Sequence, residues 1–238
     1  MGTDIEFYVE RREYGRWVPC DVWAKNPDPY AFLTADDFQA EPCWSDRNYD
    51  MFSILAGVRS TGDYKAIAPP RGLPDDMSEM LHGRAHACID DGFGHTPSWL
   101  TLSEILAYDW DQKVTLEGYA HASHFHEWVL AGRRDAGIPP PDLFDLARIE
   151  KTRPDHSLLS EEEIFQRTEA IGNPYSTKET RRELRLVSEV QAELENCFCF
   201  VSWTVTYRSR AENFFRYAVA EMKKYGTPDD VRCVFWFC

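Results

Sequence analysis

The side chains of this chain that are best suited to binding a ligand are guanidinium groups and flat rings in its central part. They occur with amide, hydroxyl, imidazole and carboxylate groups at Trp44, Arg47, Asn48, Tyr49, Arg59, Arg71, His95, Ser98, Trp99, Asp109 and Trp110. Arginine holds a phosphate through two parallel hydrogen bonds, and aromatic rings stack on nucleotide bases. These residue types indicate a site for a small nucleotide-like ligand. The alternative is that they only attach a long loop to a sheet, through Arg–Asp pairs and indole packing.

Histidines form two further groups that could act on a ligand or hold a metal ion. His121, His124 and His126 lie close together next to Glu127, and His82 and His86 are four residues apart with Cys88 beyond them. The first group has no recognised zinc spacing, so we expect a surface helix that bears several histidines. On a helix His82 and His86 could ligate one ion, but Gly83 and the turn at 90–92 favour an exposed loop. We therefore expect no metal and no cofactor.

Other catalytic signatures are absent from the sequence. It contains no G-x-x-x-x-G-K-[ST], no G-x-G-x-x-G and no G-x-S-x-G pattern, which argues against a nucleoside triphosphatase, a dinucleotide-dependent dehydrogenase and an α/β-hydrolase. The cysteines are odd in number, seven, and include no C-x-x-C pair. They indicate reduced thiols in a cytoplasm rather than a disulfide framework.

Charge and hydropathy limit the partners. Lys and Arg total 26 against 40 Asp and Glu, so the formal net charge is −14. A field of that sign repels polyphosphate, so we expect no nucleic-acid polymer as partner, although a few local arginines can still hold a small anion. The first residues do not form a secretory signal, and no apolar run approaches the length of a membrane span. We therefore expect a soluble cytoplasmic protein without a membrane partner.

The elements that must position these groups are clearest at the end of the chain. Residues 197–207 alternate as a strand does, 209–226 have helical spacing after a capping-box pattern at Ser209–Glu212, and 231–237 form a short apolar run. Strand, helix and strand in this order usually form a right-handed parallel unit. At the other end, Ile5–Glu10 and Trp17–Trp23 predict a hairpin that joins the same sheet.

The middle of the chain is mainly helical between loops. Spacing and caps predict helices over 48–58, 101–108, 121–134, 142–148, 160–172 and 176–195. The fold class is therefore α+β: one domain, 1–238, with a mixed sheet, helices on its faces and a helical insertion over 139–195 before the last strands.

Several segments resemble a largely uncharacterised family of proteins encoded by bacteriophages and prophages, whose members begin Met-Gly-Thr-Asp-Ile. The similar segments are 1–5, 8–10, 47–52, 55–59, 70–74, 98–101, 108–110 and 231–237. The insertion over 139–195 has none of this similarity. Because phages encode proteins that bind or destroy nucleotide signals of host defence, the resemblance implies a counter-defence role in an infected bacterial cell.

These observations lead to one hypothesis and two alternatives. The hypothesis is capture of a small nucleotide-derived signalling molecule without catalysis, and two protomers could enclose the ligand. Arg47, Arg59 and Arg71 would hold phosphates, Trp44, Tyr49 and Trp99 would stack on a base, and Asp109 would accept from a ribose or base. The first alternative is a phosphodiesterase or other hydrolase that uses His95, or His121 and His124. The second is an acidic protein that inhibits a host defence enzyme.

Overall fold

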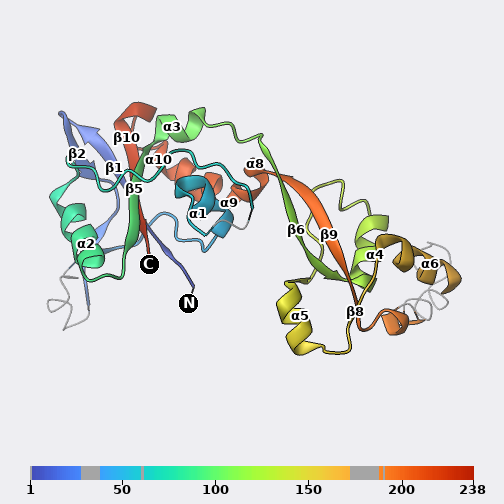
Figure 1. Ribbon diagram of the computed structural model, residues 1–238. Coiled ribbons are helices and arrows are strands. Elements are labelled where there is room, and N and C mark those ends of the chain that lie inside the picture. Colours follow the sequence, from blue (N-terminus) through green and yellow to red (C-terminus); the bar gives the residue numbers. More distant parts are fainter. Residues whose placement is uncertain (1, 28–37, 60–61, 172–187, 190) are drawn as a thin grey trace. The chain divides into compact units, whose positions relative to one another are not determined.

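The computed structural model describes residues 2–27, 38–59, 62–171, 188–189 and 191–238. The chain divides into two compact units: unit 1 is Met1–Gln112 with Tyr207–Cys238, and unit 2 is Lys113–Thr206. Each unit contains a four-stranded sheet (Figure 1). The predicted α+β class is confirmed. The expected insertion over 139–195 lies inside unit 2, and the single domain over 1–238 stays a prediction.

The sheet of unit 1 is antiparallel, with the strand order β2-β1-β10-β5. Its strands are β1 (Ile5–Glu13), β2 (Arg16–Pro19), β5 (His95–Thr101) and β10 (Val231–Phe237). The predicted hairpin is therefore confirmed, and the last strand lies beside it with Phe7 opposite Phe235. Every residue of β10 is buried, as expected for an apolar strand between two neighbours.

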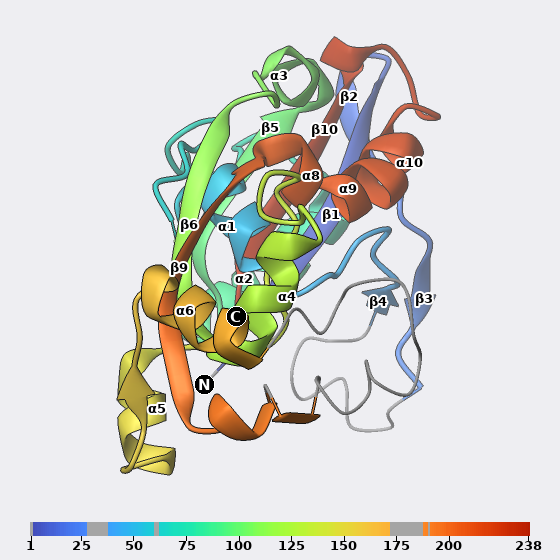
Figure 2. The same cartoon turned by 90° about the vertical axis from the view of Figure 1, so that its right-hand side faces the viewer.

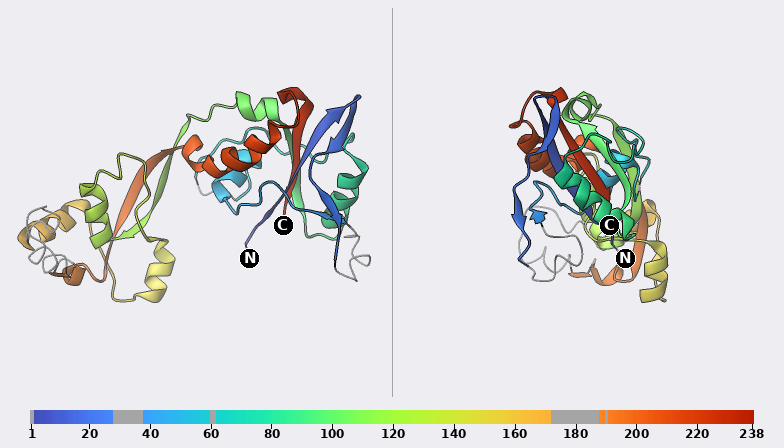
Figure 3. Two further views of the ribbon diagram at one scale, coloured as in Figure 1. Left: turned by 180° about the vertical axis from the view of Figure 1, so that it is seen from behind. Right: turned by 90° about the vertical axis from the view of Figure 1, so that its left-hand side faces the viewer.

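Helices cover both faces of this sheet (Figures 1 and 3). One face carries α1 (Tyr49–Ala56), α8 (Tyr207–Arg210), α9 (Glu212–Phe214), the π-helical turn η2 (Phe215–Val219) and α10 (Ala220–Met222). The other face carries α2 (Glu79–Asp90), so the exposed loop expected around His82 and His86 is wrong. Strand alternation supplies both cores: the Phe7 ring packs edge-on against Trp44 and Phe214, whereas Tyr8 stacks on Trp236 on the α2 side.

Smaller elements complete unit 1. They are the two-stranded sheet β3 (Trp23–Lys25) and β4 (Phe38–Ala40), the helix α3 (Leu102–Ala107) and the 3-10 turn η3 (Pro228–Asp230). The capping box at the start of α3 is present as predicted: Thr101 Oγ1 accepts from the Glu104 amide, and the Glu104 carboxylate accepts from the Thr101 amide.

Unit 2 has a mixed sheet of order β7-β6-β9-β8, in which β8 runs parallel to β9. Its elements are β6 (Lys113–His121), α4 (Ala122–Leu130), β7 (Leu143–Phe144), α5 (Leu146–Thr152), β8 (Ser157–Leu158), α6 (Glu161–Ile171) and β9 (Cys197–Thr206). Figure 2 shows α4 beside α6, and the Phe125 and Phe165 rings of these two helices are in contact. The helices expected over 121–134 and 160–172 are present, and the one expected at 142–148 begins at Leu146. The helix expected over 176–195 lies mostly outside the described residues.

The predicted parallel unit at the end of the chain is wrong. Strand β9 pairs with β6 in unit 2, from Lys113 opposite Thr206 to His121 opposite Phe198, and β10 pairs with β1 and β5 in unit 1. The long antiparallel ladder with β6 provides hydrogen-bond partners for the backbone of β9, so β9 does not pair with β10. The expected capping box at Ser209 is also wrong, because the helical segment already begins at Tyr207.

None of the helices in the described part of the chain is both long enough and apolar enough to cross a bilayer.

Candidate functional site

Two of the three arginines proposed to hold phosphate bind neighbouring residues, Asp4 and Thr3, near the start of the chain. Arg47 donates from Nε and Nη2 to the two oxygens of Asp4, at 2.7 and 2.6 Å. Arg59 donates from Nε to Thr3 Oγ1 at 2.8 Å, and the Thr3 amide donates to the Tyr49 hydroxyl at 3.3 Å. Three residues from the segment 47–59 are therefore collected around residues 3–4, beside the start of β1.

Beside this contact is a surface pocket of about 410 Å³ at the start of α1. It is lined by Asp46, Arg47, Asn48, Tyr49, Asp50 and Arg210. Asn48 positions the helix end, because its side-chain oxygen accepts from the Met51 amide and its Nδ2 donates to the Arg210 carbonyl. The pocket thus brings together three of the predicted residues and a further guanidinium group.

Sequence reasoning missed three residues of this pocket, Asp46, Asp50 and Arg210, and Arg210 is the one that adds a positive charge. Its Nε donates to Asp50 Oδ2 at 2.5 Å, and the Asp50 side chain is 8% exposed. The two residues are separated by 160 positions, and Arg210 sits at the end of the short helix α8 with no ligand-binding pattern around it. No local signal could have assigned it.

The Arg47–Asp4 pair keeps both of its side chains ionised at the edge of the pocket. Its hydrogen bonds hold the pKa of Asp4 below its ordinary value and raise the pKa of Arg47. Both side chains are more than half exposed, so water and salt screen the pair and it contributes little to stability. A phosphate, which carries more charge than a carboxylate, can therefore replace Asp4 as the partner of Arg47 at small cost.

A second group of predicted residues lies on the α2-side face of the sheet. Arg71 donates to both oxygens of Glu104, at 3.0 and 2.5 Å, and its guanidinium lies 4.8 Å from the centre of the Trp99 ring. Its amide also donates to the Ser98 hydroxyl. Arg232 approaches Trp99 as well, at 5.8 Å. In these contacts two guanidinium groups lie against the Trp99 ring. Arg71 and Trp99 do not line the pocket at the start of α1.

Trp44 and Trp110 are core residues, which corrects the stacking role proposed for Trp44. Both are buried, at 3% and 7% exposure, and both rings contact Phe214. Trp110 also donates from Nε1 to the Ile105 carbonyl at 2.7 Å. A ring enclosed in this way offers no free face to a base.

His95 and Asp109 lie apart from both groups. The Nδ1 of His95 is 2.9 Å from Thr96 Oγ1, and its ring lies along Phe237. The Asp109 carboxylate accepts from the Asp111 amide in an exposed turn. Neither contact brings these side chains to the pocket at the start of α1.

The histidines in unit 2 are held by structural contacts. His121 contacts Ser123 Oγ at 2.9 Å and the Glu195 carbonyl at 2.6 Å, and His124 faces Asp142 at 3.4 Å. Burial lowers the pKa of His121 and of His126. Within the described ranges, no group of three or more His, Cys, Asp or Glu side chains is placed to hold a metal ion.

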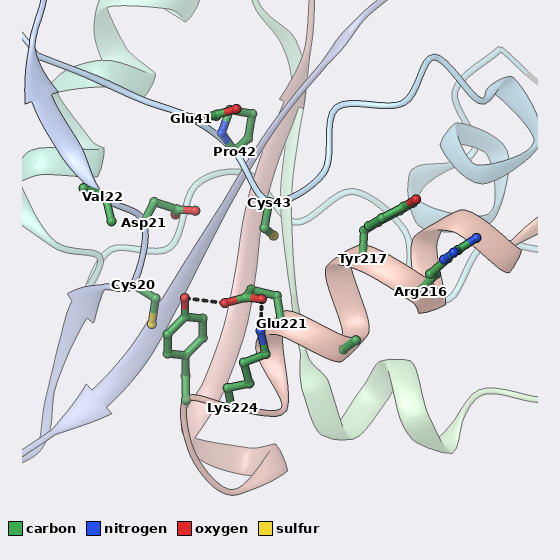
Figure 4. Close-up of a pocket in the computed structure, with 12 residues that line it drawn as sticks. Cys20, Asp21, Val22, Glu41, Pro42, Cys43, Arg216, Tyr217, Glu221 and Lys224 are labelled. Carbon is green, nitrogen blue, oxygen red and sulfur yellow. Dashed lines mark hydrogen bonds and ion pairs between the residues drawn. The ribbon is translucent and has the colours of Figure 1, made fainter.

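A separate pocket, of about 530 Å³, lies between the segment 20–22, residues 41–43 and the helical segment 216–225 (Figure 4). The Glu221 carboxylate accepts from both the Tyr225 hydroxyl and Lys224 Nζ, as Figure 4 shows. Burial raises the pKa of Asp21 to about 6, although its hydrogen bond from the Val9 amide acts against this. Burial also raises the pKa of Cys20 and of Cys43 to about 12, so both remain thiols at neutral pH and are poor nucleophiles.

Comparison of the chain with protein-family models, with curated proteins and with solved structures found no match. The functional interpretation therefore depends on the geometry of the two pockets and of the residues around them.

Proposed function

We propose that this protein binds a small nucleotide-derived molecule at the start of α1 and holds it without changing it chemically. The observation that carries the proposal is the pocket of about 410 Å³ lined by Arg47, Asn48, Tyr49 and Arg210. Arg59 lies next to it, because Thr3 contacts both Arg59 and Tyr49.

The roles follow from side-chain chemistry. Arg47 is exposed and can exchange Asp4 for a phosphate. Arg210, at the end of α8, supplies a second guanidinium group. Tyr49 supplies a ring and a hydroxyl, and Asn48 supplies an amide, so a base or ribose can be recognised beside the phosphates. Arg71 and Trp99, which contact each other on the sheet face, have no part in this site.

The absence of catalysis is part of the proposal. The pocket-lining groups are guanidinium, amide, phenol and carboxylate groups, and the two aspartates Asp50 and Asp46 already accept hydrogen bonds from Arg210 and Asn213. Such a set can bind a phosphorylated ligand but lacks an activated nucleophile with its base. The resemblance to phage-encoded proteins supports the narrower proposal that the ligand is a signalling nucleotide of bacterial defence.

Binding can be tested by titrating the protein with cyclic dinucleotides and with ADP-ribose in a calorimeter, then denaturing it by heat and analysing the released ligand. Intact ligand supports capture, and cleaved ligand would support the hydrolase instead. If the protein binds none of these compounds, capture is overturned and inhibition of a host enzyme becomes the leading alternative.

Arg47→Ala tests the site itself. Loss of a charge-assisted contact to phosphate should weaken binding about tenfold or more. Arg134→Ala is the matched control, because Arg134 also donates to both oxygens of an exposed carboxylate, that of Glu161, in unit 2. Binding that is unchanged in Arg47→Ala, or equally weakened in Arg134→Ala, would show that this pocket is not the ligand site.

A further inference from the structure

Two cysteines that are distant in sequence meet at one end of unit 1. Cys88 lies near the end of α2, and Cys238 follows β10. Their sulfur atoms are 3.6 Å apart, although the residues are 150 positions apart. A disulfide bond is about 2.0 Å long, so closing it requires the two sulfur atoms to approach by about 1.6 Å.

Main-chain contacts hold both cysteines in place. The Cys238 amide donates to the Asp4 carbonyl at 3.1 Å, and the Asp4 amide donates to the Cys238 carbonyl at 2.8 Å. On the other side, the Gly94 amide donates to the Cys88 carbonyl at 2.9 Å. Main-chain hydrogen bonds therefore fix both residues that carry the thiols. The short distance between the two sulfur atoms does not depend on a freely moving segment.

Gly94 fits the turn after α2 closely against this pair. A Cβ atom at this position would lie 3.3 Å from Cys88 Sγ and 3.1 Å from Cδ1 of the Trp236 ring. The absence of a side chain at Gly94 lets the turn lie close to both Cys88 and the Trp236 ring. Cys88 itself packs against the core cluster in which α2 contacts Tyr8 and Trp236.

The pair is more accessible than three of the other cysteines, whereas Cys20 and Cys43 are half-buried like Cys88. Cys238 is exposed and Cys88 is half-buried, whereas Cys197, Cys199 and Cys233 are buried. Cys199 and Cys233 also donate to backbone carbonyls of the neighbouring strands. A soluble oxidant can therefore reach the Cys88–Cys238 pair, while the buried thiols are protected.

We propose that Cys88 and Cys238 form a redox-modification site, which a low-molecular-weight disulfide such as oxidised glutathione converts into an intramolecular disulfide. One cysteine thiolate attacks a sulfur of the glutathione disulfide, and one glutathione leaves as a thiolate that takes up the released proton. The second cysteine loses its proton and attacks the mixed disulfide, and the second glutathione leaves. Two cysteine thiols are oxidised, and one glutathione disulfide is reduced to two thiols.

The raised pKa of Cys238 makes this exchange slow at neutral pH. Burial, the neighbouring Cys88 and the Glu6 carboxylate raise the pKa of Cys238 to about 12, and Arg84 acts in the opposite direction. Because the thiolate is the reacting form, the exchange should become faster as the pH rises from 7 to 9. The product ties α2 to the end of the central strand and constrains the unfolded chain, so the oxidised protein should melt at a higher temperature.

The test uses the full-length chain, first reduced and then incubated with oxidised glutathione at pH 8.5. The remaining thiols are blocked, and the unreduced protein is digested for peptide mapping. The expected result is one cross-link that joins the peptides of Cys88 and Cys238, a loss of two titratable thiols, and a rise in melting temperature that dithiothreitol reverses. Glutathione that stays attached to either cysteine without a cross-link would overturn the proposal.

Two variants identify the cause. Cys238→Ser should abolish both the cross-link and the rise in melting temperature, whereas Cys20→Ser, at a half-buried cysteine beside the other pocket, should keep both. A rise in melting temperature that persists in Cys238→Ser would show that another reaction causes it. Peptide mapping of the wild-type protein decides the proposal even if a variant folds poorly.

Discussion

Arg232 and Glu10 face each other across the pairing of β10 with β1, and both side chains are almost completely buried, at 2% and 0% exposure. Arg232 Nε donates to a Glu10 oxygen at 2.8 Å, and the guanidinium lies 4.0 Å from the centre of the Trp17 ring. Asp76 accepts from the same guanidinium at 2.7 Å. One buried cation therefore links the central strand, the hairpin and the loop before α2.

Removing the negative partner inside the sheet should be costly. Glu10→Gln leaves Arg232 buried with only the exposed Asp76 to balance its charge, and we expect a loss of about 3 kcal/mol in the free energy of unfolding. Glu13→Gln is the control, because Glu13 pairs with Arg11 at the surface, and its loss should cost less than about 0.5 kcal/mol. Urea unfolding of both variants measures the difference. Equal losses would show that burial of the Arg232 pair is not important for stability.

Two buried indoles should respond differently to loss of the ring nitrogen. The Nε1 of Trp44 has no hydrogen-bond partner in the described part of the chain, whereas that of Trp110 donates to the Ile105 carbonyl. Trp110→Phe should therefore cost about 1–2 kcal/mol more than Trp44→Phe, since it also leaves a carbonyl without its donor. Thermal unfolding of the pair measures this, and the reverse order would contradict the assigned contacts. Trp44→Phe should leave ligand binding unchanged, because the ring lies in the core.

Two glycines in unit 2 share a backbone conformation but differ in surroundings. Gly132 and Gly137 have φ values of +66° and +67°. A Cβ at Gly132 meets no atom within 4 Å, whereas one at Gly137 would lie 2.7 Å from the Thr204 carbonyl oxygen. Gly132→Ala should cost about 1 kcal/mol from the backbone alone, and Gly137→Ala about 2 kcal/mol more because a backbone atom must move. Melting temperatures of the two variants test this, and equal values would exclude the clash.

The buried carboxyl of Asp21 should make stability depend on pH. Its pKa is raised by burial to about 6, so the folded protein keeps a proton that the unfolded chain releases near pH 4. The stabilisation from that proton is present below about pH 4 and is lost as the pH rises through 6. As the pH rises from 4 to 7, the free energy of unfolding of Asp21→Asn should therefore increase by on the order of 2 kcal/mol relative to that of the wild type.

The effect of Asp4→Asn on stability should depend on pH in the opposite direction. The hydrogen bonds from Arg47 lower the pKa of Asp4, so its contribution is present above the unfolded pKa and is lost as the pH falls through the folded one. The destabilisation caused by Asp4→Asn should thus disappear in acid. Denaturant unfolding at several pH values tests both variants, and trends of the same sign would contradict the assignment.

Asp46 should oppose anion binding at the pocket. It lines the pocket beside Arg47 and Arg210 and accepts from Asn213 at 3.2 Å. Asp46→Asn removes a negative charge, so a phosphorylated ligand should bind several-fold more tightly. Asp135→Asn changes the net charge equally but lies in unit 2, and it should leave the affinity unchanged. An equal gain in both variants would indicate a general charge effect instead of a local one.

Sequence alone determined the local elements. The capping box of Thr101 and Glu104, the helix after Asn48 and the hairpin of β1 and β2 were predicted, because each depends on residues a few positions apart. The side-chain chemistry on which the proposed site depends is also readable in the sequence, since guanidinium groups and rings have the same chemistry wherever they lie. Arg47, Asn48 and Tyr49 are neighbours in the chain, so once one lies at the pocket the others follow.

Tertiary structure decided which of these groups meet. Packing placed Trp44 in the core but Tyr49 at the pocket, and it turned Arg71 to Glu104 instead of to a ligand. It also separated β9 from β10 and brought Arg210 to Asp50 and Cys238 to Cys88. The physical reason is that such contacts join residues about 30 to 160 positions apart, and they form only where buried apolar faces bring the segments together, which spacing along the chain does not encode.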